Sequence, residues 1–194
     1  MSLDDLRAKA SQCRACPLWK RATQTVFGKG KAPGRVMLVG EQPGDEEDKE
    51  GLPFVGPAGR LLDRALVDAE VDRRQVYVTN AVKHFNWEPR GKRRLHKTPA
   101  QQELAACYQW LEAEIAAVRP KLIICLGATA AKVLFGFAVR ITKMRGIVEH
   151  RPKFDLVATY HPSYLLRLKD KSDYAATYAQ FVGDLRLALP YLEQ

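Results

Sequence analysis

The chain has 194 residues, of which 46% are hydrophobic and 27% are charged, as is usual for a soluble globular protein. This length predicts one domain, residues 1–194, that can bury its core without disulfides as staples. A formal net charge of +9 favours a polyanionic partner. The sequence has no apolar run of membrane-spanning length, and its first residues lack the basic-then-apolar order of a secretory signal. We therefore expect a cytoplasmic protein with no membrane partner.

Hydrophobic patterning predicts an α/β domain. Four apolar segments are typical of strands, and four segments with helical spacing are typical of helices. The strands are expected at 35–39, 75–79, 121–125 and 154–159, and the helices at 60–66, 101–118, 128–134 and 174–187. Because strands and helices alternate, we expect three layers, with helices on both faces of a central, mainly parallel, four-stranded sheet. Residues 84–100 are polar, basic and rich in turn formers, which predicts an inserted loop.

The first expected strand runs into a segment dense in glycine and proline, from Gly40 to Gly59, which predicts a shaped loop. Open α/β folds bind their ligands at such strand ends. Four consecutive acidic residues, Asp45 to Asp48, make a phosphate cradle a poor interpretation of this loop. Carboxylates at the mouth of a pocket suit instead a reaction in which positive charge develops on the substrate.

The four cysteines need an explanation other than disulfides, which are disfavoured in the cytoplasm. Two residues separate Cys13 from Cys16, a spacing that lets both sulfurs face one metal ion. Cys107 lies on an expected helix, and Cys125 ends an expected strand. The spacing alone leaves three interpretations open: an iron–sulfur cluster, a zinc site, or two buried cysteines beside an unrelated Cys-x-x-Cys turn.

Two motifs carry a resemblance to a known family. The run from Gly40 to Gly59, GEQPGDEEDKEGLPFVGPAG, resembles the first motif of the uracil-DNA glycosylase superfamily, most closely that of its iron–sulfur branch, family 4. The run HPSYLLR from His161 resembles the second motif, His-Pro-Ser-x-Leu-Leu-Arg. Family 4 usually has alanine where this chain has Gln42. That departure and the basic insert 91–96 resemble the UdgX class, whose members remove uracil and then become covalently attached to DNA through a histidine.

The resemblance implies a uracil-DNA glycosylase fold with a [4Fe-4S] cluster that ties the N-terminal arm, residues 1–34, to the rest of the domain. It assigns the cluster to all four cysteines, Cys13, Cys16, Cys107 and Cys125. It also implies a pocket for a flipped uracil. The residues expected to bind the base are Gln42, Glu47, Phe54, Asn80 and His161. Glu47 would exclude the methyl group of thymine, and Phe54 would stack on the base. Asn80 would pair with the edge of the base, and His161 would donate a hydrogen bond to its O2.

Each of these residues also has a plainer interpretation. Aromatic loop residues such as Phe54 are commonly hydrophobic plugs. An asparagine after a strand, such as Asn80, is commonly a turn residue or a helix cap. His161 is followed by proline, a common helix start that needs no chemistry.

The role of His96 decides between two possible functions. It lies in a run with five basic residues, Arg90 to Lys97, whose composition alone indicates a phosphate-binding loop that happens to contain a histidine. The resemblance to UdgX implies instead that His96 attacks C1′ of the sugar, as a neutral imidazole can. The expected catalytic residues are Glu41, Gln42, Asp45, His96 and His161, and the expected DNA contacts are Lys92, Arg93, Arg94, Lys97, Ser163 and Arg167.

The sequence therefore predicts a monomeric DNA-repair enzyme that excises uracil from DNA, accepts single strands, and is then trapped on the abasic sugar through His96. One alternative is a conventional family 4 enzyme that uses water and turns over many times. A second alternative is a non-catalytic iron–sulfur module that binds DNA.

Overall fold

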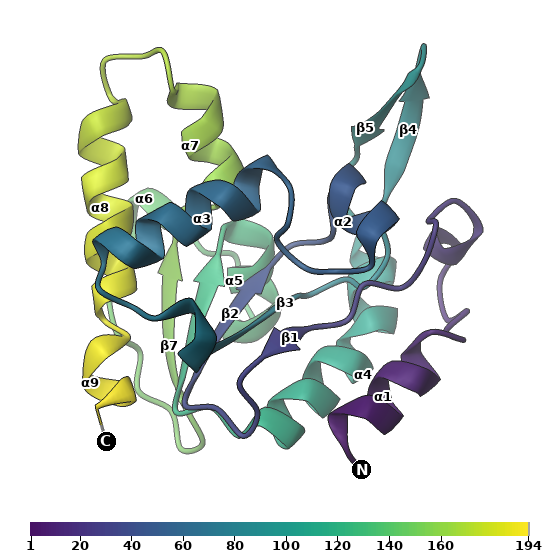
Figure 1. Cartoon of the computed structure of the whole chain (residues 1–194), viewed down its shortest axis with the longest axis horizontal. Coiled ribbons are helices and arrows are strands. Elements are labelled where there is room, and N and C mark those ends of the chain that lie inside the picture. The colour runs from purple at the N-terminus through teal and green to yellow at the C-terminus, as the bar shows by residue number, and fades with distance from the viewer. Residues whose placement is uncertain (194) are drawn as a thin grey trace.

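The computed structural model describes residues 1–193 of the chain (Figure 1). Its main sheet has the strand order β1-β3-β2-β6-β7, formed by β1 (Lys29–Gly30), β2 (Val36–Gly40), β3 (Val76–Asn80), β6 (Leu122–Leu126) and β7 (Asp155–Thr159). The α-helices are α1 (Leu3–Ala10), α2 (Asp45–Glu50), α3 (Pro57–Asp68), α4 (Gln101–Val118), α5 (Ala128–Phe135), α6 (Ile141–Met144), α7 (Pro162–Leu168), α8 (Tyr174–Arg186) and α9 (Leu189–Leu192). Short 3-10 turns lie at Pro17–Lys20 and Arg73–Gln75.

The α/β fold with a mainly parallel sheet is confirmed. β2, β3, β6 and β7 run parallel, and each lies within about one residue of its expected position. The expected number of four strands is wrong, because β1 adds a fifth strand that pairs antiparallel with β3. β1 has two residues, one of them glycine, and is too short to produce the alternating pattern by which strands are predicted.

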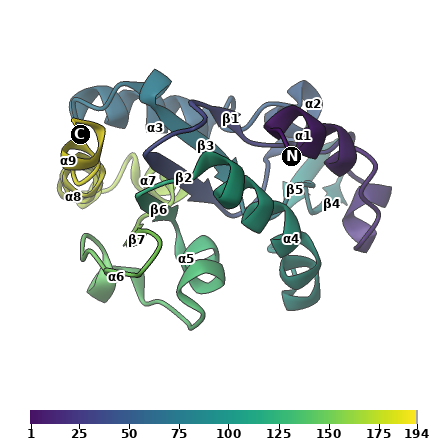
Figure 2. The same cartoon turned by 90° about the horizontal axis from the view of Figure 1, so that it is seen from below.

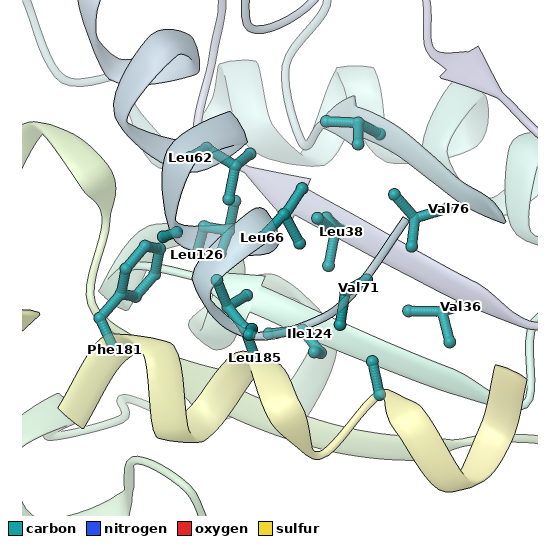
Figure 3. Packing of buried hydrophobic residues seen from close by; sticks show 14 of the residues in the cluster. Val36, Leu38, Leu62, Leu66, Val71, Val76, Ile124, Leu126, Phe181 and Leu185 are labelled. Atoms are coloured by element: carbon teal, nitrogen blue, oxygen red, sulfur yellow. The ribbon is translucent and has the colours of Figure 1, made fainter. Parts of the chain in front are cut away.

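Helices cover both faces of the sheet (Figures 1 and 2). Successive side chains of a strand point to opposite faces, and each face forms its own core. Figure 3 shows the core beneath α3 and α8, which includes Val36, Leu38, Leu62, Leu66, Ile124, Phe181 and Leu185. The core of the other face, beneath α4 and α5, includes Met37, Val39, Leu111, Ile123, Ala131 and Leu134. Burial on both faces explains why these strands read as continuous apolar runs.

The acidic run that was expected to lie in a loop forms helix α2. Gly44 caps its start, where the backbone N–H of Gly44 donates to the side chain of Glu47 (3.0 Å). Gly51 ends it with a left-handed φ of 71°. Carboxylates in a first turn are stabilised by the positive end of the helix dipole, which gives the run Asp45 to Asp48 a structural reason.

The basic insert forms a hairpin rather than the expected loop. Strands β4 (Trp87–Arg90) and β5 (Arg93–His96) pair antiparallel, and Gly91 and Lys92 connect them. Gly91 has a φ of 60°, as the first position of a tight hairpin turn requires. Figure 1 shows this hairpin projecting from the sheet beside α2. Its strands are polar and contain Pro89, so they carry no strand signal.

Hydrogen bonds hold the N-terminal arm against the rest of the fold. The backbone N–H of Val26 donates to the carbonyl of Lys83 (2.8 Å), and that of Gly28 donates to the carboxylate of Glu114 (2.8 Å). Thr23 donates to Asp48 through both its backbone N–H and its hydroxyl group. These hydrogen bonds join the arm to α2, to α4 and to the segment after β3. Within residues 1–193, no helix is both long and apolar enough to cross a membrane.

Candidate functional site

The candidate site is a cleft at the carboxyl ends of β2, β3, β6 and β7, the edge where α/β sheets bind ligands. Its volume is about 820 Å³. Residues that follow these strands line the cleft together with one residue of the hairpin, and the polar ones include Glu41, Asn80, His96, Thr129 and His161. The topology therefore collects groups that are far apart in sequence.

Glu41 and His96 contact each other in this cleft. Nε2 of His96 lies 3.0 Å from Oε1 of Glu41, and the Thr129 hydroxyl group donates to Oε2. Burial opposes ionisation of Glu41, but the hydrogen bonds from His96 and Thr129 outweigh it and lower the pKa of the carboxyl group. Because an ionised carboxylate can only accept, a neutral His96 carries its proton on Nε2 and a lone pair on Nδ1.

His161 presents a hydrogen-bond donor. Its Nδ1 accepts a hydrogen bond from the backbone N–H of Ser163 (3.1 Å), which also makes it the cap of α7. Burial lowers the pKa of His161 to about 4, so the ring is neutral at pH 7. A neutral ring with an accepting Nδ1 carries its proton on Nε2. The helix-start interpretation and the donor interpretation of His161 are therefore compatible.

Asn80 presents an acceptor. The residue is 2% exposed, and its Oδ1 is the one buried side-chain N or O atom of residues 1–193 that lacks a hydrogen-bond partner. Leaving a buried acceptor unpaired costs about 1–3 kcal/mol, so such an atom in a cleft points to a ligand with a donor. Gly40 lies opposite Asn80 in the sheet, and a Cβ on Gly40 would come within 2.4 Å of Oδ1. Glycine is thus required for Asn80 to occupy this place.

Phe54 supplies an apolar wall. It is 5% exposed, belongs to the core beneath α3, and also lines the cleft. The centroid of its ring lies 6.2 Å from that of His161, with the rings tilted by 36°. Its φ of 56° is rare for a bulky residue and costs about 1–3 kcal/mol, a form of strain that clusters at functional sites.

Comparison with known proteins decides the family. The family model described as the uracil DNA glycosylase superfamily matches residues 27–186. A type-4 uracil-DNA glycosylase of Thermotoga maritima is 42% identical over 161 residues, which cover 82% of this chain and 80% of that protein. The chain belongs to this superfamily. A type-4 uracil-DNA glycosylase of Archaeoglobus fulgidus is 34% identical, and the match covers 95% of this chain and 93% of that protein. One of Sulfurisphaera tokodaii is 36% identical, and the match covers 85% of this chain and 76% of that protein.

Gln42 lines the cleft, and its side-chain amide forms hydrogen bonds with the residues at the base of the hairpin. Its Oε1 accepts from the backbone N–H of Asn86 (3.0 Å), and its Nε2 donates to the carbonyls of Asn86 (3.1 Å) and Lys97 (3.2 Å). Glu47 is likewise occupied, because its two oxygens accept from the backbone N–H groups of Gly44 and Gly56. Both residues shape the pocket wall, and neither has an oxygen left without a partner.

Arg94 does not have the place expected of a DNA contact. Its guanidinium group donates to Asp45 and to the fully buried Asp48 (2.6 Å), and it lies over the rings of Phe85 and Trp87. Desolvation opposes the charge of Arg94, but the two carboxylates raise the pKa of its guanidinium group. The pair joins the hairpin to α2, a structural contact that the expected roles of Arg94 in phosphate binding and of Asp45 in catalysis do not include.

The other expected DNA contacts lie on the surface. Lys92, Arg93 and Lys97 are exposed on or beside the hairpin, where solvated cations can meet phosphates. Ser163 and Arg167 line the cleft on α7 and contact each other at 3.4 Å.

Three of the four cysteines lie near one another, and Cys125 does not join them. Burial is the main cause that raises the pKa of Cys107, and electrostatic repulsion from the nearby Cys16 and Cys13 adds to it. Cys125 is completely buried between the sheet and α5, and burial alone raises its pKa. Among residues 1–193, no three metal-binding side chains are close enough to share an ion. The expected set of four cysteine ligands stays a prediction; in this structure Cys125 lies in the core between the sheet and α5, apart from the other three.

Several residues around the site have no signal in the sequence that predicts a role for them. Thr129 holds Glu41, and nothing in its sequence context marks it. His84 is 5% exposed, and its Nε2 lies 2.9 Å from Thr25 Oγ1, which donates to the carbonyl of Ala10 (3.0 Å). That same carbonyl accepts from the backbone N–H of Cys13 (2.9 Å), so His84 lies close to the Cys-x-x-Cys turn.

Proposed function

We propose that this protein excises uracil from DNA, as its curated type-4 relatives are named for doing. The observation that carries the proposal is the pairing of a buried free acceptor, Oδ1 of Asn80, with a neutral N–H donor, Nε2 of His161, in one cleft. The Watson–Crick edge of uracil has a donor at N3 beside carbonyl acceptors, which complements both groups. Phe54 would stack on the flipped base.

The cleft groups suit cleavage of the N-glycosidic bond. When that bond breaks, its electrons leave with uracil, which develops negative charge on its carbonyl oxygens. A donor such as the His161 N–H stabilises this charge, as oxyanion donors do. The sugar develops positive charge, which the ionised Glu41 carboxylate stabilises. Each group therefore acts more strongly in the transition state than in the ground state.

Water and His96 are two candidate acceptors for the resulting sugar cation. The type-4 names of the relatives favour water, with Glu41 orienting it and taking its proton. The 3.0 Å contact between His96 and Glu41 favours the second candidate, covalent capture. In that step the C1′–N1 bond breaks and uracil leaves as an anion, while a lone pair of the His96 ring forms a bond to C1′. The ring N–H proton passes through Glu41 to the uracil anion, and the products are a protein–DNA adduct and free uracil.

The substrate we propose is uracil in DNA, single strands included, bound by a monomer. The net charge of +9 and the exposed cations Lys92, Arg93 and Lys97 support attraction to phosphates. Arg167 and Ser163 at the lip of the cleft would hold the backbone next to the flipped nucleotide.

We also propose that the cysteine site holds a [4Fe-4S] cluster through Cys13, Cys16 and Cys107, with His84 as the fourth ligand. The hydroxyl group of Thr25 donates its proton to the carbonyl of Ala10, so its oxygen accepts a hydrogen bond from Nε2 of His84. His84 therefore carries its proton on Nε2 and a lone pair on Nδ1. Burial lowers the pKa of His84, and a neutral imidazole is a metal ligand. The cluster would fasten the arm to α4, which is a structural role.

One experiment separates these possibilities. The protein is incubated with a uracil-containing single-stranded oligonucleotide, heated in detergent, and analysed on a denaturing gel while free uracil is quantified. Uracil release beyond one equivalent with no shifted band supports the water-using enzyme. One equivalent of uracil and a shifted band that His96→Ala abolishes support capture. Neither uracil nor a shifted band would reject both enzymatic proposals and leave a DNA-binding module.

A further inference from the structure

A buried ion pair lies directly behind Asn80. The side chains of Lys83 and Glu114 are 1% and 0% exposed, and they contact each other. Lys83 Nζ also donates to the hydroxyl group of Thr79 (2.8 Å) and to the backbone carbonyl of Asn80 (2.5 Å). All three protons of the ammonium group therefore have acceptors.

Glu114 joins this pair to its surroundings. Its Oε1 accepts from the backbone N–H of Gly28 (2.8 Å) and from the hydroxyl group of Tyr77 (2.9 Å), and its Oε2 accepts from Thr79 (2.9 Å). A buried ion pair costs so much desolvation that apolar residues of the same size are often as stabilising. Stability alone is therefore a weak reason for charges at this place.

The pair holds the backbone carbonyl group of Asn80, and Gly40 on the neighbouring strand β2 lies against the Asn80 side chain. Lys83 is itself fixed, because its backbone N–H donates to Sγ of Cys107 on α4 (3.2 Å). The ammonium group of Lys83 holds the backbone carbonyl of Asn80. The side chain of Asn80 packs so closely against Gly40 that a Cβ atom on residue 40 would not fit. A small displacement of Oδ1 would misalign it with a donor on a bound base.

We propose that Lys83 is a positioning residue that holds Asn80 for recognition of the base, so that the buried pair sets the rate of uracil release through Asn80. This inference rests on the proposed function, because it takes the edge of uracil as the partner of Asn80. Lys83 does not touch the substrate; it acts through the carbonyl group of Asn80.

A double-mutant cycle tests this proposal. The pair is neutralised as Lys83→Met with Glu114→Gln, in the wild-type protein and in Asn80→Ala, and single-turnover rates of uracil release are compared. We expect a loss of about tenfold in the wild-type background and of less than about twofold with Asn80→Ala, since coupled residues are not additive. Equal losses in both backgrounds would overturn the proposal.

Tyr77→Phe provides the matched control. It removes one hydrogen bond from the same carboxylate without touching Asn80, so its effect should be the same in both backgrounds. Wild-type protein that releases no uracil would reject the proposed function and this inference with it. Wild-type release with an additive cycle would reject only the positioning role.

A measurement on the unaltered protein covers the case in which the neutralised pair does not fold. The buried Lys83 ammonium group should give a slowly exchanging nitrogen–proton NMR signal, because its protons are shielded from water. This signal should shift when free uracil saturates the cleft and pulls on Asn80. A signal that stays unchanged at saturation would overturn the proposal.

Discussion

Gln42 and Asn86 form two hydrogen bonds, one in each direction, between the side-chain amide of Gln42 and the backbone of Asn86. Asn86 immediately precedes the hairpin, and Lys97, which accepts a third hydrogen bond from Gln42, immediately follows it. The glutamine that departs from the usual family 4 motif thus closes the base of the hairpin that carries His96. The two departures form one structural unit.

Gln42→Ala should loosen the hairpin without unfolding the protein. The backbone N–H of Asn86 would lose its acceptor, so its hydrogen exchange should become at least about tenfold faster, as should that of Lys97. Exchange is measured by NMR or mass spectrometry. Gln42→Glu is the matched control, because it keeps the acceptor for Asn86 and loses both donated hydrogen bonds. Unchanged protection in Gln42→Ala would contradict the role as a clamp.

Arg94 and Arg93 should respond in opposite ways to alanine. Arg94→Ala leaves the buried Asp48 without its cation and should lower the free energy of unfolding by at least about 2 kcal/mol. Arg93→Ala should leave stability unchanged and reduce the slope of log Kd for DNA against log salt by roughly 1, because Arg93 is exposed. Urea unfolding and binding titrations across a salt series measure the two effects. An Arg94→Ala variant that keeps its stability and shows a reduced salt slope would support a role of Arg94 in phosphate binding.

Iron content should distinguish the cysteines. Cys107→Ala and His84→Ala should lose iron and the broad absorbance near about 400 nm that iron–sulfur proteins show. Cys125→Ala should keep both, because Cys125 faces the core between the sheet and α5. Circular dichroism checks that each variant is folded. A folded Cys125→Ala protein without iron would return Cys125 to the ligand set.

Stability should fall in mild acid because of His161. Its pKa is about 4 in the folded protein and about 6.5 in the unfolded chain. Between these values the unfolded chain binds more protons, so the free energy of unfolding decreases as the pH falls from about 6.5 to about 4, and His161 has no such effect above about 6.5. Urea unfolding at about pH 7 and about pH 5 measures this, and His161→Asn should show the smaller loss. Equal losses in both proteins would contradict the lowered pKa.

Local sequence patterns were sufficient for the main elements of this protein. Burial on both faces makes β2, β3, β6 and β7 continuous apolar runs. Residues at or just beyond their carboxyl ends, such as Asn80 and His161, are recognisable by that position. The short or polar elements have no such signal. β1 and the hairpin depend on pairing partners that are distant in sequence or on a single glycine turn.

What each polar side chain contacts was decided only by the tertiary structure. Glu41, Gln42 and Asp45 are close in sequence, yet the fold turns them toward His96, the base of the hairpin and Arg94, respectively. Composition and spacing select residue types, whereas hydrogen-bond partners depend on how distant segments pack. For the same reason the sequence supplied four cysteines, and the packing of β6 placed Cys125 in the core.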